Sequence, residues 1–351
     1  VPIALFLSEE MDSTFVDNPI VALEGLRKSA NKFELFCEAG QIKVPANANF
    51  IFSLLEKSVH EVALANYKSF HPKVWLIAYK NEQEEIIYRL LVLSRNLTFD
   101  RSWDMVIALE GKRTKQKTNK NKPLAAFLSF LLPYTTDLEK LKKIEQLIAE
   151  LDYIHFETGD KHYVDVEFCP IGIEGYGKAE FGLFTNYHHM LIVSPFLSEE
   201  TVSDINKLSL KHASKTLITR KSELSKLNET LLSELDVYVL KDLIIDGEEM
   251  ISGDQEKNET HQLQDIHAKM YVKTKYNEHH IYIGSANCSK NAFNGNVEFL
   301  LKLTYEKRGF RITNLLADFF GEDEKENPFE KVEMMSEFEE GDVDLTEMLQ
   351  K

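Results

Sequence analysis

Two short stretches of the sequence place a histidine and a lysine two residues apart at the start of an apolar run. They read FHPKVWL, with His71 and Lys73, and DIHAKMYV, with His267 and Lys269. A histidine can act as a nucleophile, or as a general acid and base near neutral pH, while a lysine adds a positive charge. The pairing suits chemistry on an anionic group.

Each H-x-K pair is followed by a serine and an asparagine in S-x-N spacing, and then by an acid. The two sets are Ser94, Asn96 and Asp104 in the first half of the chain, and Ser285, Asn287 and Glu298 in the second. The offset between the halves is nearly constant, at 196 residues for the histidines, 191 for the serines and 194 for the acids. This ordered recurrence indicates an internal duplication.

Strands are the elements that must position these residues. Side chains two positions apart in a strand point to the same side, so H-x-K presents an imidazole and an ammonium group together. A hairpin partner can bring the serine and the asparagine beside them. Apolar runs predict strands at 61–66, 71–79, 85–94 and 104–111 in the first half, and at 189–197, 215–220, 236–240, 267–274, 279–285 and 297–304 in the second.

Helices are predicted between the strands. Residues 137–151 carry leucine and isoleucine at helical spacing, with Thr136 and Glu139 as a capping box. Residues 198–208 carry apolar side chains along one face, and an amphipathic segment covers 20–32. The order of helices and strands in both halves is that of an α/β protein.

If the two halves face each other, two histidines, two lysines and two asparagines meet around one point. Such a set is a suitable receptor for a phosphodiester. Lysine and amide donors would stabilise the equatorial oxygens, and the two imidazoles would lie in line on opposite sides of phosphorus. Both motifs lie in one chain, so a dimer is not needed to build this site, and the oligomeric state is left open.

H-x-K followed by S-x-N, twice in one chain, resembles the phospholipase D superfamily, which includes phospholipases, metal-independent nucleases and restriction enzymes, and tyrosyl-DNA phosphodiesterases. The resemblance covers residues 30–110 and 185–305. Many members carry an aspartate where this chain has Ala78 and Thr274, and a glycine where it has Leu93. The nucleic-acid branch often lacks that aspartate too. The contexts SRNLTFDRSWD and GSANCSKNAFNGNVEF look most similar to nuclease and defence-associated members.

The resemblance implies an α/β fold of two pseudo-twofold-related α-β-α sandwich halves with mixed sheets. We place the first half at residues 1–152, the second at 153–320 and an acidic tail at 321–351. The helix at 137–151 would join the halves, with one active site at their interface.

The resemblance also implies a mechanism. His71 would attack phosphorus to form a phosphohistidine, and His267 would act first as acid and then as base. Binding of the phosphoryl oxygens would fall to Lys73, Lys269, Asn96 and Asn287. Hydrogen bonds to the imidazoles would come from Asp104 and Glu298, and positioning from Ser94 and Ser285. No metal or other cofactor is required in this scheme.

Composition limits the partners and the compartment. The net charge of −16 weighs against a protein that coats nucleic acid with a basic face. The basic stretch at 111–122 is either a contact for a nucleic-acid backbone or a plain solvated loop, and the polar stretch at 246–262 is typical of a loop. No apolar run reaches about eighteen residues, so no membrane insertion is expected. The chain start lacks the basic region of a signal peptide.

Three scattered cysteines indicate a reducing, cytoplasmic compartment and show no zinc-ligand spacing; they are Cys37, Cys169 and Cys288. The function we expect is metal-independent hydrolysis of DNA or RNA, in a restriction or defence setting, with a helicase or recognition domain as a candidate partner. Two alternatives stay open: a phospholipase acting on head groups, and an inactive module of the same fold that binds nucleic acid or protein.

Overall fold

The computed structural model describes residues 30, 32–42, 56–66, 68–96, 102–177, 181–241, 265–321 and 327–332. Nearly all of the predicted amphipathic segment, the loop at 246–262 and most of the acidic tail lie outside these residues. In the part of the chain that the structure describes, no helix is long and apolar enough to cross a membrane.

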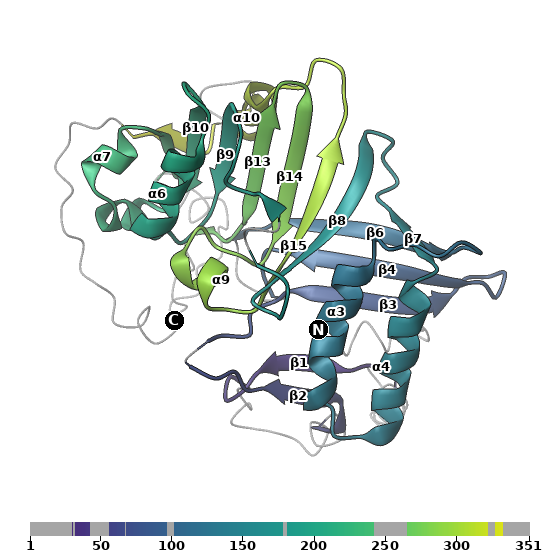
Figure 1. Cartoon of the computed structure of the whole chain (residues 1–351). Helices are drawn as coiled ribbons and strands as arrows, with labels where there is room; N and C mark the ends of the chain where they lie inside the picture. Colours follow the sequence, from purple (N-terminus) through teal and green to yellow (C-terminus); the bar gives the residue numbers. More distant parts are fainter. Residues whose placement is uncertain are drawn as a thin grey trace, which may run out of the picture.

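The first half is built on a four-stranded antiparallel sheet in the order β3-β4-β6-β7. A separate parallel pair, β1 with β2, lies beside it (Figure 1). Two helices, α3 and α4, pack against each other and complete this half. The bounds are β1 Leu35–Glu38, η4 Glu56–Ser58, β2 Val59–Val62, β3 Val74–Lys80, β4 Ile86–Leu93, β6 Val106–Arg113, α3 Lys122–Leu131, η5 Leu132–Tyr134, α4 Leu138–Leu151 and β7 Ile154–Glu157.

The second half is an eight-stranded mixed sheet in the order β16-β11-β10-β9-β13-β14-β15-β8. Strands β9, β10 and β11 are parallel to one another, and the other neighbours pair antiparallel. The bounds are β8 Tyr163–Ile171, β9 His189–Val193, α6 Glu199–Leu208, β10 Ser214–Thr219, η6 Lys221–Lys226, α7 Glu229–Leu232, β11 Asp236–Leu240, β13 Met270–Lys275, β14 Glu278–Gly284, α9 Lys290–Asn294, β15 Glu298–Tyr305, α10 Ile312–Phe320 and β16 Phe329–Lys331.

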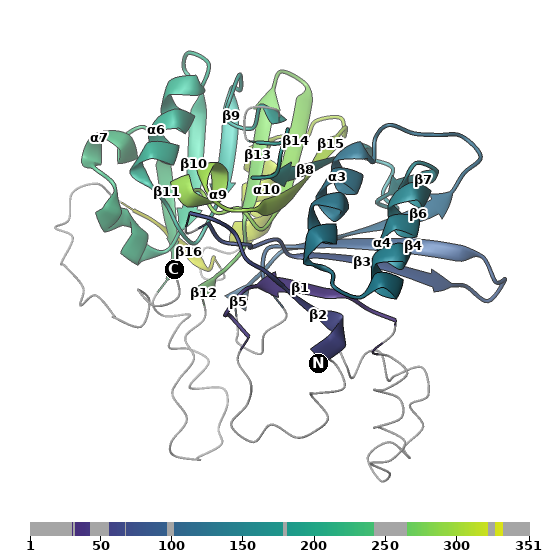
Figure 2. The same ribbon diagram turned by 60° about the horizontal axis from the view of Figure 1, so that its bottom comes forward.

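The larger sheet is buried on both faces, which explains its nearly continuous apolar strands. Successive residues alternate between two cores: Phe299 and Leu301 point into the core shared with the first half, whereas Leu300 points into the core beneath α6 and α9. In Figure 2, α6 and α7 lie on the side of this sheet away from the first half. Helix α3 joins the shared core, where the ring of Phe127 packs 5.0 Å from that of Phe299. The two halves therefore share one hydrophobic core.

The halves are also joined by backbone pairing that repeats. Strand β5 (Ser102–Trp103) pairs in parallel with β12 (Asp265–Ile266), just before the second histidine. Phe70, just before the first histidine, makes a parallel bridge with Val297. In each half, the segment just before the histidine therefore pairs with the segment just before the acid of the other half. This reciprocal pairing confirms the predicted α/β class, with two related halves and both parallel and antiparallel strand pairs.

Several element boundaries differ from those expected. Helix α4 begins after Asp137, whose carboxylate caps the backbone N–H groups of Glu139 and Lys140, so the predicted capping box at Thr136 is wrong. Helix α3 was not predicted. Strand β7 follows residue 152 but pairs in the first sheet, because Ile154 and Phe156 complete the core of that half. Strand β16 lies inside the predicted tail, since Phe329 is buried against the larger sheet.

The three cysteines, Cys37, Cys169 and Cys288, are free thiols. Two of them are buried, and burial raises the pKa of Cys288 to about 12. Cys169 and Cys288 are core residues, and burial holds their thiols protonated near neutral pH.

Gly284 ends β14 at a point where the neighbouring strand leaves no room for a side chain. Its φ is 157°, and a Cβ there would lie 2.1 Å from the carbonyl oxygen of Phe299. We expect Gly284→Ala to push β14 from β15 and to lower the free energy of unfolding by about 3 kcal/mol or more, the upper range for overpacking. Urea denaturation measures this loss.

Gly159→Ala is the matched control, because Gly159 also has a positive φ, of 80°, but no atom lies within 4 Å of the added Cβ. Its loss should stay near the strain of a left-handed residue, about 1–2 kcal/mol. Equal losses for the two variants would contradict the close approach at Gly284.

Candidate active site

The motif residues lie at strand ends and not within strands. His71 and Lys73 precede β3, and His267 and Lys269 precede β13, so the predicted placement of H-x-K on a strand face is wrong. The S-x-N residues follow β4 and β14, and the pairs β3–β4 and β13–β14 are antiparallel hairpins as expected. Because these residues lie at strand ends, their side chains are not confined to one face of the sheet and can point toward the other half.

Backbone bonds hold the hairpins in the same register in both halves. The N–H of Leu93 donates to the carbonyl of Lys73 at 2.9 Å, and the N–H of Gly284 donates to that of Lys269 at 3.5 Å. Leu93 therefore takes the place of the glycine without losing this bond. In each half the S-x-N segment stays next to the H-x-K segment.

The histidines are held by the opposite half. The N–H of His71 donates to the carbonyl of Val297 at 2.9 Å, and that of His267 donates to the carbonyl of Trp103 at 3.0 Å. Val297 and Trp103 each precede the acid of their motif. Each imidazole is thereby placed beside residues of the other half, which the sequence pattern alone does not specify.

The two serines brace the strands that carry the acids. Ser94 Oγ accepts from the N–H of Met105 at 2.8 Å, and Ser285 Oγ accepts from that of Phe299 at 3.0 Å. The Ser285 hydroxyl also donates to the Glu298 carboxylate. Both serines are fully buried. Their role in the structure is to fix the acid-bearing strands against the hairpin ends, which agrees with a positioning role.

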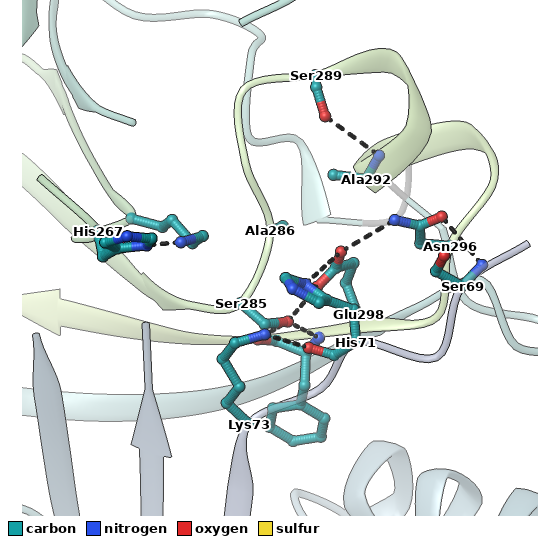
Figure 3. A network of polar contacts seen from close by, with 12 residues as sticks. Ser69, His71, Lys73, His267, Ser285, Ala286, Ser289, Ala292, Asn296 and Glu298 are labelled. Carbon is teal, nitrogen blue, oxygen red and sulfur yellow. Dashed lines mark hydrogen bonds and ion pairs between the residues drawn. The ribbon is translucent and has the colours of Figure 1, made fainter. Parts of the chain in front are cut away.

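Glu298 reaches across the boundary between the halves to His71. Figure 3 shows the imidazole of His71 beside this carboxylate, with Nδ1 3.1 Å from each carboxylate oxygen. A carboxylate only accepts hydrogen bonds, so Nδ1 carries a proton, and in the neutral imidazole Nε2 presents its lone pair. The Asn296 side chain links the carboxylate to the N–H of Ser69, at 3.4 Å and 3.2 Å. The His71 side chain remains 37% exposed and can be reached by a substrate.

His267 has a different neighbour. Its Nε2 lies 3.1 Å from Nη2 of Arg220 and 3.7 Å from the Asp265 carboxylate. Asp104, one of the two acids expected to hydrogen-bond an imidazole, bonds to Arg95 at 3.5 Å. Burial raises the pKa of Asp104, while the positive charge of Arg95 acts against this shift. Arg95 occupies the middle of the first S-x-N motif, so the cation that pairs with Asp104 comes from the motif itself.

Both lysines are buried in the site. Each Nζ donates to the carbonyl of the histidine before it, at 2.9 Å for Lys73 and 2.8 Å for Lys269. Burial lowers the pKa of Lys73 from 10.5 to about 8, against the attraction of Glu298. Burial also lowers the pKa of Lys269 to about 7, and the charge of Lys73 lowers it further. The two ammonium groups, one from each half, are therefore close enough to repel each other.

The asparagines differ in their surroundings. Asn96 is exposed at the end of the first motif, whereas Asn287 is partly buried. The side-chain oxygen Oδ1 of Asn287 is buried and has no hydrogen-bond partner among the described residues. A buried amide oxygen without a hydrogen-bond partner destabilises the folded protein, so we expect a bound ligand to supply a donor to it.

Sequence reasoning missed four residues of this site: Arg95, Arg220, Asp265 and Asn296. Arg95, Asp265 and Asn296 lie inside the motif segments SRNLTFDRSWD, DIHAKMYV and GSANCSKNAFNGNVEF, whereas Arg220 lies outside them. Arg220 lies 47 residues before His267, and only the fold brings the two together.

The basic stretch at 111–122 forms surface ion pairs that its composition does not predict. It follows the end of β6 opposite to Asp104. Three of its lysines pair with carboxylates: Lys112 with Glu110 at 3.1 Å, Lys117 with Asp152 at 2.8 Å, and Lys120 with Asp165 at 2.5 Å. This favours the plain solvated loop. As for metals, the described residues contain no group of three or more His, Cys, Asp and Glu side chains placed to hold an ion.

No family model matches the sequence, and no curated protein matches it. Solved structures that resemble the chain include yeast tyrosyl-DNA phosphodiesterase, at 15% identity, 78% of each chain covered and a TM-score of 0.47. Phosphatidylserine synthase from Haemophilus influenzae Rd KW20 shares 9% identity over 92% of this chain and 80% of that chain, with a TM-score of 0.47. Polyphosphate kinase from Porphyromonas gingivalis shares 11% over 85% of this chain and 40% of that chain, with a TM-score of 0.42.

Lys269→Met tests the buried charge. The pKa of Lys269 is about 7 in the folded protein and 10.5 in the unfolded chain, so between these values the unfolded chain binds more protons and wild-type stability rises with pH. We expect Lys269→Met to have a higher free energy of unfolding than wild type near about pH 6. This difference should decrease by about 3–4 kcal/mol between about pH 6 and about pH 10. Urea denaturation of both proteins across this range measures the difference.

Lys290→Met is the control, since Lys290 is exposed on α9 and Glu200 holds its pKa above the usual value. This variant should gain no stability at low pH. If the free energies of unfolding of both variants changed with pH in parallel with that of wild type, Lys269 would not be a buried charge in solution.

Proposed function

We propose that this chain is a phosphodiesterase of the phospholipase D type that works through a phosphohistidine intermediate. The observation that carries the proposal is the 3.1 Å contact between His71 Nδ1 and Glu298, made across the boundary between the halves. It fixes the proton on Nδ1 and turns the lone pair of Nε2 outward, as a nucleophile needs. Lys73 and Lys269 supply positive charge from both halves beside it.

In the first step, His71 Nε2 forms a bond to phosphorus while the bond from phosphorus to the leaving oxygen breaks. The phosphorylated imidazole becomes cationic, and the Glu298 carboxylate stabilises that charge. His267 gives a proton to the leaving oxygen. The lysines and Asn287 bind the phosphoryl oxygens, whose charge grows as the bond breaks.

In the second step, His267 accepts a proton from water, and the resulting hydroxide attacks phosphorus. The bond between phosphorus and His71 Nε2 breaks, which releases a phosphomonoester and restores the neutral imidazole. No electron acceptor or further reactant is consumed, so one water is added for each bond cleaved.

We propose nucleic acid as the substrate, in a restriction or defence setting. The segments at 94–104 and 284–299 resemble nuclease members, and Ala78 and Thr274 stand where many other members of the superfamily carry an aspartate. The buried Arg95 in the first motif adds a cation suited to a phosphate oxygen.

The test uses labelled single-stranded DNA, double-stranded DNA and RNA, with phosphatidylcholine vesicles as the lipid arm, all in EDTA. We expect cleavage of a nucleic acid and a loss of about a thousandfold or more in kcat/KM for His71→Asn, the scale of a removed catalytic group. His267→Asn should accumulate protein whose mass is raised by one phosphoryl-linked fragment, detected by intact mass spectrometry.

His155→Asn is the matched control, because His155 is an exposed histidine on β7 outside the site. It should retain wild-type activity. Three outcomes contradict the proposal: full activity in His71→Asn, cleavage abolished by EDTA, or binding with no turnover on any substrate. Cleavage of the lipid alone would reassign the substrate to phospholipid head groups.

A further inference from the structure

Arg220 directly follows β10 and is held beside His267 by contacts with Asp265 and Phe196. Its Nε donates to Oδ1 of Asp265 at 2.8 Å, and Nη2 pairs with the other oxygen of that carboxylate. Its Cζ lies 4.5 Å from the centre of the Phe196 ring. Bidentate pairing with a carboxylate and stacking on an aromatic ring together fix the plane of a guanidinium group. The Arg220 side chain is only 12% exposed, so its position is set by the protein and not by solvent.

The contact between Arg220 and His267 determines which nitrogen of the imidazole carries the proton. Arginine has only donors, so Nε2 of His267, 3.1 Å from Nη2, must be the unprotonated acceptor and the proton must lie on Nδ1. Burial lowers the pKa of His267 to about 3, and the charges of Arg220 and Lys269 lower it further. His71 faces a carboxylate instead. The nearest charged group is thus a carboxylate at His71 and a guanidinium at His267.

An imidazole in this state cannot donate the proton that a leaving oxygen needs. A general acid at His267 must be the imidazolium, and its second proton would have to be added to Nε2, the atom that Arg220 occupies. The guanidinium must therefore find another acceptor before the acid can form. An anion at the site is the natural competitor.

Cationic side chains gather at this point. Among the described residues they are Lys73, Lys269, Arg95 and Arg220, which share the site with the carboxylates of Glu298, Asp104 and Asp265. A phosphodiester carries one negative charge, and its two non-bridging oxygens suit the fork of a guanidinium.

We propose that Arg220 is a phosphate-binding residue that controls when His267 can act as an acid, an inference that rests on the proposed phosphodiesterase function. In the free protein, Arg220 holds Nε2 of His267 as an acceptor. A bound phosphodiester takes over the Nη2 donor, and the released Nε2 accepts a proton from solvent. The acid is loaded only when a substrate anion is present.

Nitrogen NMR of the histidine side chains in the full chain tests this, with inorganic phosphate as the probe and His267→Asn for assignment. In wild type we expect a neutral Nδ1–H ring across about pH 5–8, and phosphate should raise its pKa by about one unit or more. Arg220→Gln should raise the pKa of His267 without phosphate and weaken phosphate binding about tenfold or more.

Arg89→Gln is the matched control, because Arg89 lies on β4 and pairs with Tyr79 and Glu110 outside the site. It should change neither quantity. Wild-type titration of His267 and wild-type phosphate affinity in Arg220→Gln would overturn the proposal. If that variant does not fold, Arg220→Lys tests the same point, because it keeps the charge and loses Nη2; unchanged phosphate affinity there would overturn it.

The two proposals fail separately. A protein that turns over no substrate, yet shows the phosphate-linked titration of His267, would remove the enzymatic function and leave the role of Arg220 in place. A protein that cleaves a phosphodiester while Arg220→Gln titrates like wild type would keep the function and reject the role of Arg220.

Discussion

The Glu298 carboxylate is 1% exposed, and a carboxylate buried to that degree is tolerated only when its oxygens accept hydrogen bonds. The donors come from both halves of the chain: the Ser285 hydroxyl from the same half and His71 Nδ1 from the other. The halves must close on each other before this charge is satisfied. Closure buries the shared core and brings the H-x-K segments of both halves around one space.

The same closure has an energetic cost that the core must offset. Two lysines are buried with lowered pKa values, and Asn287 keeps a buried oxygen without a partner among the described residues. Sites of this kind are destabilising in the empty protein and are stabilised by an anion that neutralises them. The backbone repeats its hydrogen bonds faithfully in both halves, while the side chains around the two histidines differ. Under the proposed mechanism, this asymmetry would let one duplicated motif provide both a nucleophile and an acid.

The sequence was sufficient to predict the α/β class and the two hairpins, because strand periodicity and the duplicated spacing are local signals. It could not predict that His71 would meet Glu298 of the other half, since that contact depends on how the halves pair. Arg220 was out of reach for the same reason. Local rules also failed at Asp137, where a neighbouring residue takes over the helix cap, and at β7, where completing a core moves the boundary of a half past residue 152.

The central claim is that both halves build one site around a single phosphoryl group. A crystal structure of the full chain soaked with orthovanadate, which imitates phosphorus during transfer, tests it most directly. The account predicts one vanadate bound to Nε2 of His71, with His267 on its opposite side and both lysines on its equatorial oxygens. Two vanadates, one in each half, or a vanadate held away from His71, would contradict it.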